Sequence, residues 1–139
     1  MKEYSDGANY LLRFDRGEEV ITTLLRWARD RKPDGAFLTG LGAVERPHLG
    51  YFDAEKKGYI DKEFEGEFEI ASLSGNLAWD GVDPVAHIHV TIAGPNFLAF
   101  GGHLYSAVVS GTVEIAVITF ASKLERKYKE ELNLKLLVD

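Results

Sequence analysis

The chain has 139 residues, 45% of them hydrophobic and 27% charged, which is typical of one globular domain large enough to bury its own core. It contains no cysteine, so disulfides, thiolate zinc sites and cysteine nucleophiles are excluded, and any metal must be held by histidine and carboxylate. A net charge of −6 argues against a nucleic-acid interface, and the lack of a long apolar run or signal-peptide core predicts a cytoplasmic protein with no membrane partner.

The first predicted elements are a strand and a helix. Residues 1–8 are polar and predicted to be a flexible leader, and the apolar run 10–14 is predicted to be the first strand. Residues 18–32 have apolar side chains at helical spacing, with acids in the first turn and bases in the last, and Pro33 ends this helix. The apolar stripe consists of Val20, Ile21, Leu24, Trp27 and Ala28.

Residues 36–73 are predicted to form strands. Two strands are expected at 36–44 and 47–52, and a charged hairpin turn at 53–58. Residues 59–73 are then either a pair of strands or one bent strand, because Gly66 interrupts an alternation of apolar residues with glutamates.

Three of the four histidines lie between residues 84 and 104. Residues 85–93 alternate cleanly between the two faces of a strand, so that Ile88 and Val90 point to one side while His87 and His89 point to the other. A turn signal at 94–96 leads to another apolar segment and to the third histidine, His103.

The length of the loop after residue 93 decides where His103 lies. A three-residue loop at 94–96 sets it opposite His87, a five-residue loop at 94–98 sets it opposite His89, and an even-numbered loop turns it to the other face. Directly paired residues on one face have Cβ atoms about 5 Å apart. The two odd loops therefore predict a three-histidine cluster that can hold a divalent transition metal.

The C-terminal part contains two further local signals. Ser110-Gly111 has the pattern of a two-residue hairpin turn, and the resulting register puts Glu114 on the histidine face. Ser122 and Glu125 have the spacing of a capping box, which predicts a short second helix extending to residue 132.

Alternation of Leu134, Leu136 and Val138 predicts a last strand. The elements together indicate an α+β fold: a single domain over residues 1–139, with a twisted, mainly antiparallel β-sheet and two helices.

Four segments resemble the "plant and prokaryote conserved" (PPC) domain, and they occur in the order found in that family. They are GLGAVERPHLGYFD at 40–53, FEGEFEIASLSGNL at 64–77, DPVAHIHVTIAG at 83–94 and GGHL at 101–104. The resemblance covers residues 8–138 and implies a twisted sheet assembled as a homotrimer. Plant members join the domain to an AT-hook, an Arg-Gly-Arg-Pro segment that binds A·T-rich DNA. This chain has no such segment, so DNA is not expected as its partner.

The resemblance also bears on the histidines, because in prokaryotic members the positions that match His87, His89 and His103 look like a metal site. Three imidazoles with an open fourth position are typical of catalytic zinc, so zinc is the expected metal, although nickel, iron or manganese can bind the same nitrogens. Carboxylates orient metal-bound imidazoles, and Glu69 and Glu114 are the candidates for that role.

Three functions are compatible with the sequence. The first is a metal-binding homotrimer that holds or acts on a small anionic ligand, with catalysis left open. The second is a DNA-binding regulatory protein, as names given to members of the family suggest. The third is a structural trimer that recruits partners. The absence of Cys and Gln, together with a single Met, favours a thermophilic source.

Overall fold

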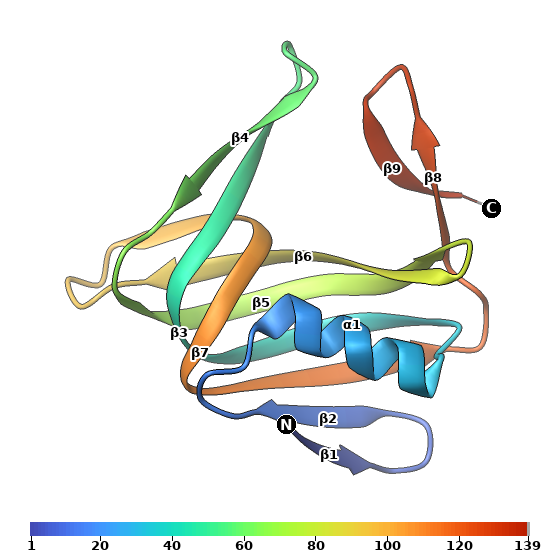
Figure 1. The fold of residues 1–139 in the computed structure, drawn as a ribbon, viewed down its shortest axis with the longest axis horizontal. Helices are drawn as coiled ribbons and strands as arrows, with labels where there is room; N and C mark the ends of the chain where they lie inside the picture. Colours follow the sequence, from blue (N-terminus) through green and yellow to red (C-terminus); the bar gives the residue numbers. More distant parts are fainter. Residues whose placement is uncertain (139) are drawn as a thin grey trace.

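Nine strands and one helix make up residues 1–138, the part of the chain that this computed structural model describes (Figure 1). The order is β1 (Lys2–Ser5), β2 (Tyr10–Phe14), α1 (Val20–Arg31), β3 (Gly35–Asp53), β4 (Gly58–Glu63), β5 (Glu67–Asp80), β6 (Asp83–Ala93), β7 (Ala99–Phe120), β8 (Glu125–Lys129) and β9 (Leu134–Val138). The predicted single domain built on a mainly antiparallel sheet is confirmed. Residues 1–138 contain one helix instead of two.

All nine strands belong to one sheet. Its main path runs β1-β2-β7-β3-β5-β8-β9, while β4 pairs with β3 and β6 pairs with both β5 and β7. The sheet is mixed, because β5 and β8 meet in parallel at Trp79 and Glu125 while the other pairs are antiparallel. The two longest strands, β3 and β7, pair along most of their lengths.

Strand β7 changes its partner along its length. Its first residues pair with β6, and its last residues pair with β2. The sheet therefore curls: β6, which is not part of the main path, pairs with β5 on one side and with the start of β7 on the other (Figure 1). This closure brings a segment near residue 103 next to the middle of β6.

Helix α1 lies against one face of the curled sheet (Figure 1). The Glu19 carboxylate caps its start by accepting hydrogen bonds from the backbone N–H groups of Ile21 and Thr22, and Lys32 ends it in the left-handed conformation. Full burial of an aliphatic side chain contributes about 1.5–3 kcal/mol, so this packed face fixes which way each strand points. The core between helix and sheet includes Leu12, Leu24, Leu38, Leu73, Leu77, Ile88, Val90, Ile115 and Val117.

The predicted helix at 18–32 and the strands at 10–14 and 134–138 are confirmed, and two other predictions change. Residues 2–5 form β1, paired with β2, where a flexible leader was expected. The strands expected at 36–44 and 47–52 are one strand, β3. Of the two alternatives for residues 59–73, the structure has the pair of strands: β4 and β5 both pair with β3. Gly66 lies between them, with a φ of +97°.

The hairpin predicted at Ser110-Gly111 is wrong. Strand β7 continues through this position without a turn, and its register against β3 shifts there, since Val109 pairs with Val44 while Val113 pairs with Gly42. The small residues thus accommodate an irregularity in a long strand. Pairing with a distant strand has overridden the local turn signal.

The predicted second helix at 122–132 is also wrong, because this segment contains β8 and the turn that leads to β9. The apolar side chains that a helix would align on one face are not buried: Tyr128 is 56% exposed and Leu132 is 43% exposed. The inward-facing residue of β8 is Arg126, which is only 6% exposed. Pairing with the apolar strand β9 decides the conformation, and Asn133 provides a left-handed residue in the turn.

Within the described residues, the single helix is too short and too polar to span a membrane.

Candidate metal centre

His87 and His89 lie on β6 with their side chains on the face of the sheet opposite the core. Ile88 and Val90, between and beyond them, are 0% and 3% exposed and pack in the core. The burial of these two residues fixes the direction of the imidazoles, because side chains alternate along a strand. The alternation predicted from the sequence is confirmed.

The neighbouring strand β5 approaches this segment closely. Gly75 pairs with Ile88, and a Cβ atom added to Gly75 would lie 2.2 Å from the carbonyl oxygen of His87. Only glycine fits at this distance. The close pairing holds the backbone between the two histidines in a fixed position.

His103 joins the other two histidines through the five-residue loop at 94–98, one of the three possibilities left open by the sequence. β6 ends at Ala93, β7 starts at Ala99, and His103 pairs directly with His89. On the other side of His103, β7 pairs with Gly50 of β3. The third imidazole is therefore held between two strands.

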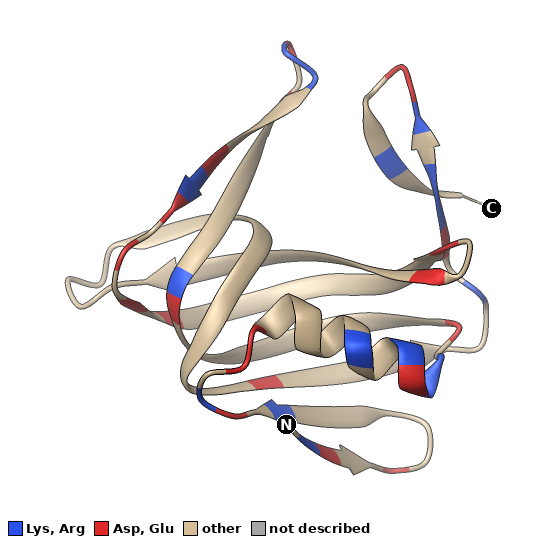
Figure 2. Ribbon diagram, in the orientation of Figure 1, with Lys and Arg blue, Asp and Glu red and all other residues tan. Residues whose placement is uncertain are grey.

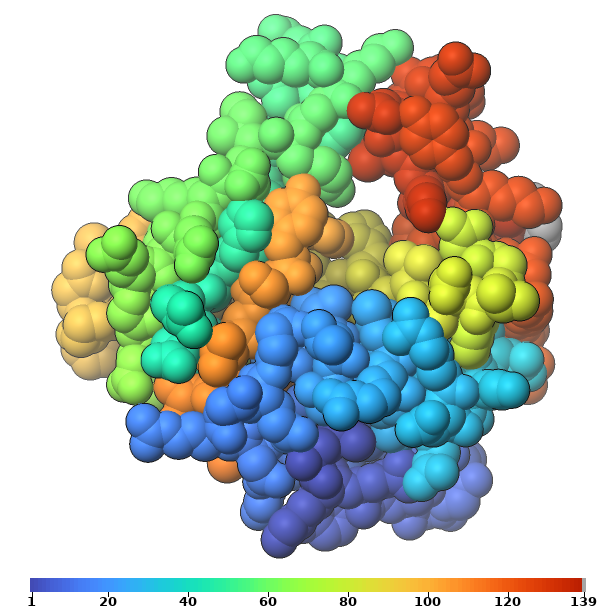
Figure 3. Space-filling model, in the orientation of Figure 1, coloured from blue at the N-terminus to red at the C-terminus, as the bar shows by residue number. Residues whose placement is uncertain are grey.

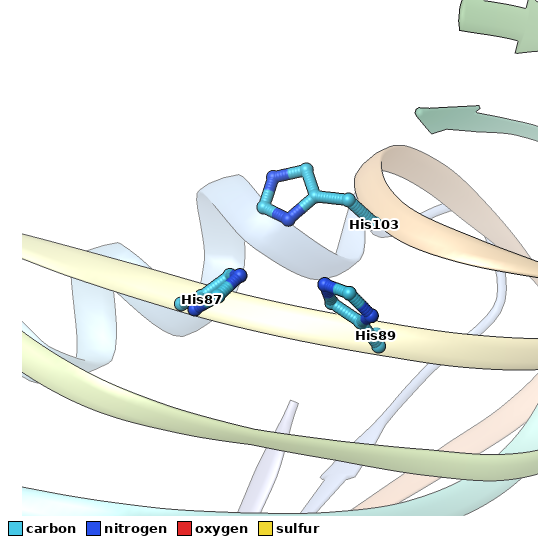
Figure 4. A group of neighbouring side chains, drawn as sticks. All are labelled: His87, His89 and His103. Carbon is cyan, nitrogen blue, oxygen red and sulfur yellow. The ribbon is translucent and has the colours of Figure 1, made fainter. Parts of the chain in front are cut away.

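The three imidazoles form one compact cluster (Figure 4). The ring of His87 lies 5.2 Å from those of His89 and His103, and the rings of His89 and His103 are 5.7 Å apart. One nitrogen of each ring lies within 4.8 Å of the others, and Figure 4 shows each ring turning a nitrogen toward the shared space. Ligand nitrogens of one tetrahedral zinc ion lie about 3.4 Å apart, so an ion would draw the rings closer together.

The electrostatics of the cluster favour neutral imidazoles. Burial, followed by the neighbouring His87, His89 and Arg126, lowers the pKa of His103 from 6.5 to about 4. Burial and the charge of Arg126 also lower the pKa of His87. In addition, the Nδ1 atom of His103 is buried and has no hydrogen-bond partner among the described residues. A buried ring nitrogen without a hydrogen-bond partner suits a metal ion, so the side chains present fit the ion that the sequence predicted.

Arg126 and Asn76 complete the surroundings of His87, and sequence reasoning missed both. Nη2 of Arg126 donates to Oδ1 of Asn76 at 2.9 Å and to Nδ1 of His87 at 3.1 Å, and Nη1 donates to the backbone carbonyl of Lys135 at 2.8 Å. Asn76 pairs directly with His87 across β5 and β6. The only sequence signal for Arg126 is that it would share one face of a strand with Leu124 and Tyr128, a period-two relation that the helical pattern concealed.

The contact between Arg126 and His87 determines which ring nitrogen carries hydrogen. A guanidinium has only donors, so Nδ1 of His87 accepts and the hydrogen of the neutral ring lies on Nε2. Nε2, the other ring nitrogen and the one that an ion could bind, therefore carries the hydrogen as long as Arg126 donates to Nδ1. Coordination through Nε2 requires that hydrogen to move to Nδ1, where it would face another donor. Arg126 and an ion bound at Nε2 therefore compete for His87.

A pocket of about 390 Å³ opens beside the cluster. Its walls come from β4, β6, β7 and the β8–β9 hairpin, and Figure 3 shows an opening between this hairpin and the β3–β4 arm. The lining residues are Tyr59, Val85, Ala86, His87, His103, Arg126, Tyr128, Asn133, Leu134, Lys135 and Leu136. A volume of this size suits a small organic molecule.

The other candidate residues lie elsewhere. Glu69 pairs with Ala93 and lines a different hollow, and Glu114 pairs with Arg13 and Leu41, with β3 and β5 between it and the histidines of β6. In residues 1–138, no hydrogen bond joins either carboxylate to an imidazole of the cluster.

His48, the fourth histidine of the chain, forms a hydrogen bond with Asp61 at 2.6 Å. It is not among the three histidines that converge.

Comparison with solved structures identifies several proteins of the same fold. A metal-containing protein from Archaeoglobus fulgidus is 33% identical, with a TM-score of 0.87 and 100% of both chains covered. A plant- and prokaryote-conserved protein from Pyrococcus horikoshii is 32% identical, with a TM-score of 0.88 over 96% of this chain and 92% of that one. A candidate DNA-binding protein from Bacteroides thetaiotaomicron is 26% identical, with a TM-score of 0.94 over 99% and 96%.

Comparison of the sequence gives one curated relative and one domain family. The chain is 32% identical over 110 residues to the bifunctional protein GlmU of a Synechococcus strain, a match that spans 78% of this chain but 16% of that curated relative. The pattern of the Plants and Prokaryotes Conserved (PCC) domain matches residues 1–121, which include all three histidines of the cluster. The chain therefore belongs to the Plants and Prokaryotes Conserved domain family.

Proposed function

We propose that this protein binds one divalent transition metal ion, most favourably zinc, through His87, His89 and His103, and that the ion holds a small anionic ligand. The observation that carries the proposal is the buried Nδ1 of His103, which lacks a hydrogen-bond partner in residues 1–138 and belongs to a ring that faces two other imidazoles. The metal-containing relative from Archaeoglobus fulgidus supports it.

The chemistry of the ligand set supports an open site. The cluster offers three imidazoles, which bind a metal as neutral ligands, and no carboxylate, so zinc bound there keeps its charge of +2 and one free position. Such an ion binds an anion or lowers the pKa of bound water. His87 and His89 are oriented by the core residues Ile88, between them, and Val90, beyond them, and His103 is held between two strands.

The proposal includes assembly as a homotrimer, as the family resemblance implies. The face of the sheet opposite α1 carries exposed apolar side chains on three adjacent strands, and a face of this kind is typical of a subunit interface. These strands are β2, β7 and β3, which are neighbours in the sheet. The apolar residues are Leu11, Phe37, Leu41, Ile118 and Phe120, which are 40–57% exposed.

Metal analysis of protein purified without a histidine tag tests the first part. We expect close to one equivalent of zinc per chain after reconstitution, measured by inductively coupled plasma mass spectrometry. Less than about 0.2 equivalents would remove the proposal, because a site built from three pre-positioned imidazoles binds zinc tightly. Light scattering coupled to size-exclusion chromatography tests the second part, and a monomer at micromolar concentration would contradict it.

DNA binding is the second candidate, since the relative from Bacteroides thetaiotaomicron is named as a candidate DNA-binding protein. The charge distribution of this chain weighs against it. Basic residues at the end of α1 and on β8 lie among acidic ones, and the net charge is −6 (Figure 2). Titration with duplex DNA at low salt separates the two candidates, because phosphate contacts are strongest there.

A further inference from the structure

We propose that Arg126 is the anion-binding residue of this site and that the ligand is a small organic carboxylate with an apolar body. This inference rests on the proposed metal function and deepens it, because it assigns the ligand's acidic group to a residue outside the histidine cluster. Arg126 belongs to β8, and residue 121 is the last that matches the family pattern.

The first support is a buried charge without a countercharge. Arg126 is 6% exposed, and its three hydrogen-bond acceptors are the neutral groups of Asn76, His87 and Lys135. In residues 1–138 no carboxylate forms an ion pair with it, and its Nε is buried without a partner. A buried guanidinium in this state is costly, and a carboxylate is the group that best matches its planar donors.

The second support is the composition of the pocket. Not one of its lining residues is Asp or Glu, although the chain contains 22 of them. Its second cation, Lys135, is paired with Asp80 at the rim, which leaves Arg126 as the charge directed at the pocket interior. A pocket that excludes carboxylate side chains and contains an unpaired guanidinium selects an anion.

The third support specifies the rest of the ligand. Four aliphatic residues, two from β6 and two from β9, line the pocket beside Arg126: Val85, Ala86, Leu134 and Leu136. Inorganic phosphate or acetate would leave this apolar wall without a partner, whereas a carboxylate with an aromatic or branched body would cover it.

Competition for His87 links the anion to the metal. An ion bound at Nε2 of His87 ends the hydrogen bond between that ring and Nη2 of Arg126. The freed donor then faces the same pocket as the ion. Zinc and carboxylate therefore strengthen each other's binding, and the coupling is reciprocal.

Titration of 4-fluorobenzoate followed by ¹⁹F NMR tests the proposal. The wild-type chain, Arg126→Gln, Arg126→Lys and the matched control Lys127→Gln are each titrated with and without zinc. Lys127 is exposed on the same strand, so its replacement changes the net charge equally without altering the pocket. We expect Arg126→Gln to weaken the probe at least tenfold, roughly the value of a charged hydrogen bond, and Lys127→Gln to change nothing. Acetate and phosphate should compete poorly.

The outcomes distinguish this inference from the metal proposal. Equal affinity of Arg126→Gln and wild type for 4-fluorobenzoate would overturn the role of Arg126 even if zinc binds stoichiometrically. Absence of zinc binding with a tenfold loss in Arg126→Gln would overturn the metal site and keep the anion site. Failure of wild type to bind the probe at millimolar concentration overturns the carboxylate assignment. Arg126→Lys keeps the charge but loses the planar fork, so it provides a folded comparison if the glutamine variant is unstable, and equal binding by it would contradict the geometry.

Discussion

The two walls of the pocket are held in place very differently. The histidine wall is part of the closed region of the sheet, where β6 is hydrogen-bonded to β5 on one side and β7 on the other. The opposite wall, formed by the β8–β9 hairpin and here called the hairpin wall, meets the rest of the sheet at one bridge between Trp79 and Glu125. A few side-chain hydrogen bonds complete this contact. Metal ligands need precise positions, which paired strands supply, whereas an anion-binding arginine needs mainly the correct charge at the correct depth.

The patterns of the two walls differ as well. On β6, apolar side chains point to the core and imidazoles point away from it. On β8 the buried position is taken by Arg126, while Tyr128 is exposed. The comparison teaches that the histidines of the proposed metal site follow from an ordinary strand pattern, whereas the buried arginine departs from that pattern.

The largest effect should come from breaking the histidine wall. We expect His87→Ala to lower zinc affinity by more than about 100-fold, because removing groups that merely orient a ligand already costs 10–100-fold. Competition with a chromophoric chelator measures it. His48→Ala is the matched control, since this histidine bonds with Asp61 away from the cluster, and it should bind zinc like the wild type. Similar losses in both variants would contradict a defined site.

The second prediction separates the histidine wall from assembly. Phe37→Arg places a charge in the middle of the exposed apolar face and should dissociate the proposed trimer, at a cost of about 2 kcal/mol or more for each buried contact. Zinc binding should persist, because one chain supplies all three histidines. Light scattering and metal content report the two effects. Val82→Arg, in the turn between β5 and β6, is the control and should leave the assembly intact. Loss of zinc together with the trimer would show that the site needs a neighbouring subunit.

The third prediction concerns pH and the metal-free protein. The pKa of His103 is about 4 in the folded chain against 6.5 as the ordinary value, so the unfolded state binds more protons between these limits. Stability is therefore complete above pH 6.5 and falls on acidification toward pH 4, by at most about 3 kcal/mol and less because the ring is only partly buried. Urea unfolding at several pH values measures it. His103→Asn should flatten this part of the profile, and an unchanged slope would refute the assignment.

The smallest effect should come from the hairpin wall. Arg126→Gln removes a positive charge and a competing hydrogen-bond donor next to His87, so zinc affinity should rise about three- to tenfold, or ~1 kcal/mol. Lys127→Gln should leave the affinity unchanged, because its exposed charge is screened by solvent. A fall in zinc affinity in Arg126→Gln would mean that the arginine supports the metal site and does not compete with it.

The histidine wall was largely predictable because its information is local. Alternation along 85–93 places His87 and His89 on one face whatever the rest of the chain does, and an odd loop then brings His103 to them. The choice between the odd loops was not local. It depends on the pairing of β7 with β3 as well as β6, which involves residues about 50 positions apart.

The hairpin wall was not predictable because the contacts that bury Arg126 come from distant parts of the chain. Ser122 and Glu125 carry a genuine helix-start signal, but β8 gains its partner from β9 and its buried arginine from acceptors on β5 and β6. Ser110-Gly111 was misread in the same way, since pairing with β3 outweighed the turn.

By itself the sequence determined the family, the predominance of strands, the first helix and the three imidazoles as a group, because composition and short-period alternation record which side chains need a core. Only the tertiary structure decided that β7 continues without a turn, that the C-terminal segment pairs as a hairpin and that Arg126 lies beside His87. The physical reason is that the course of β7 and the burial of Arg126 depend on partners remote in the chain, and that strand hydrogen bonds outweigh the weak local preferences of a few residues.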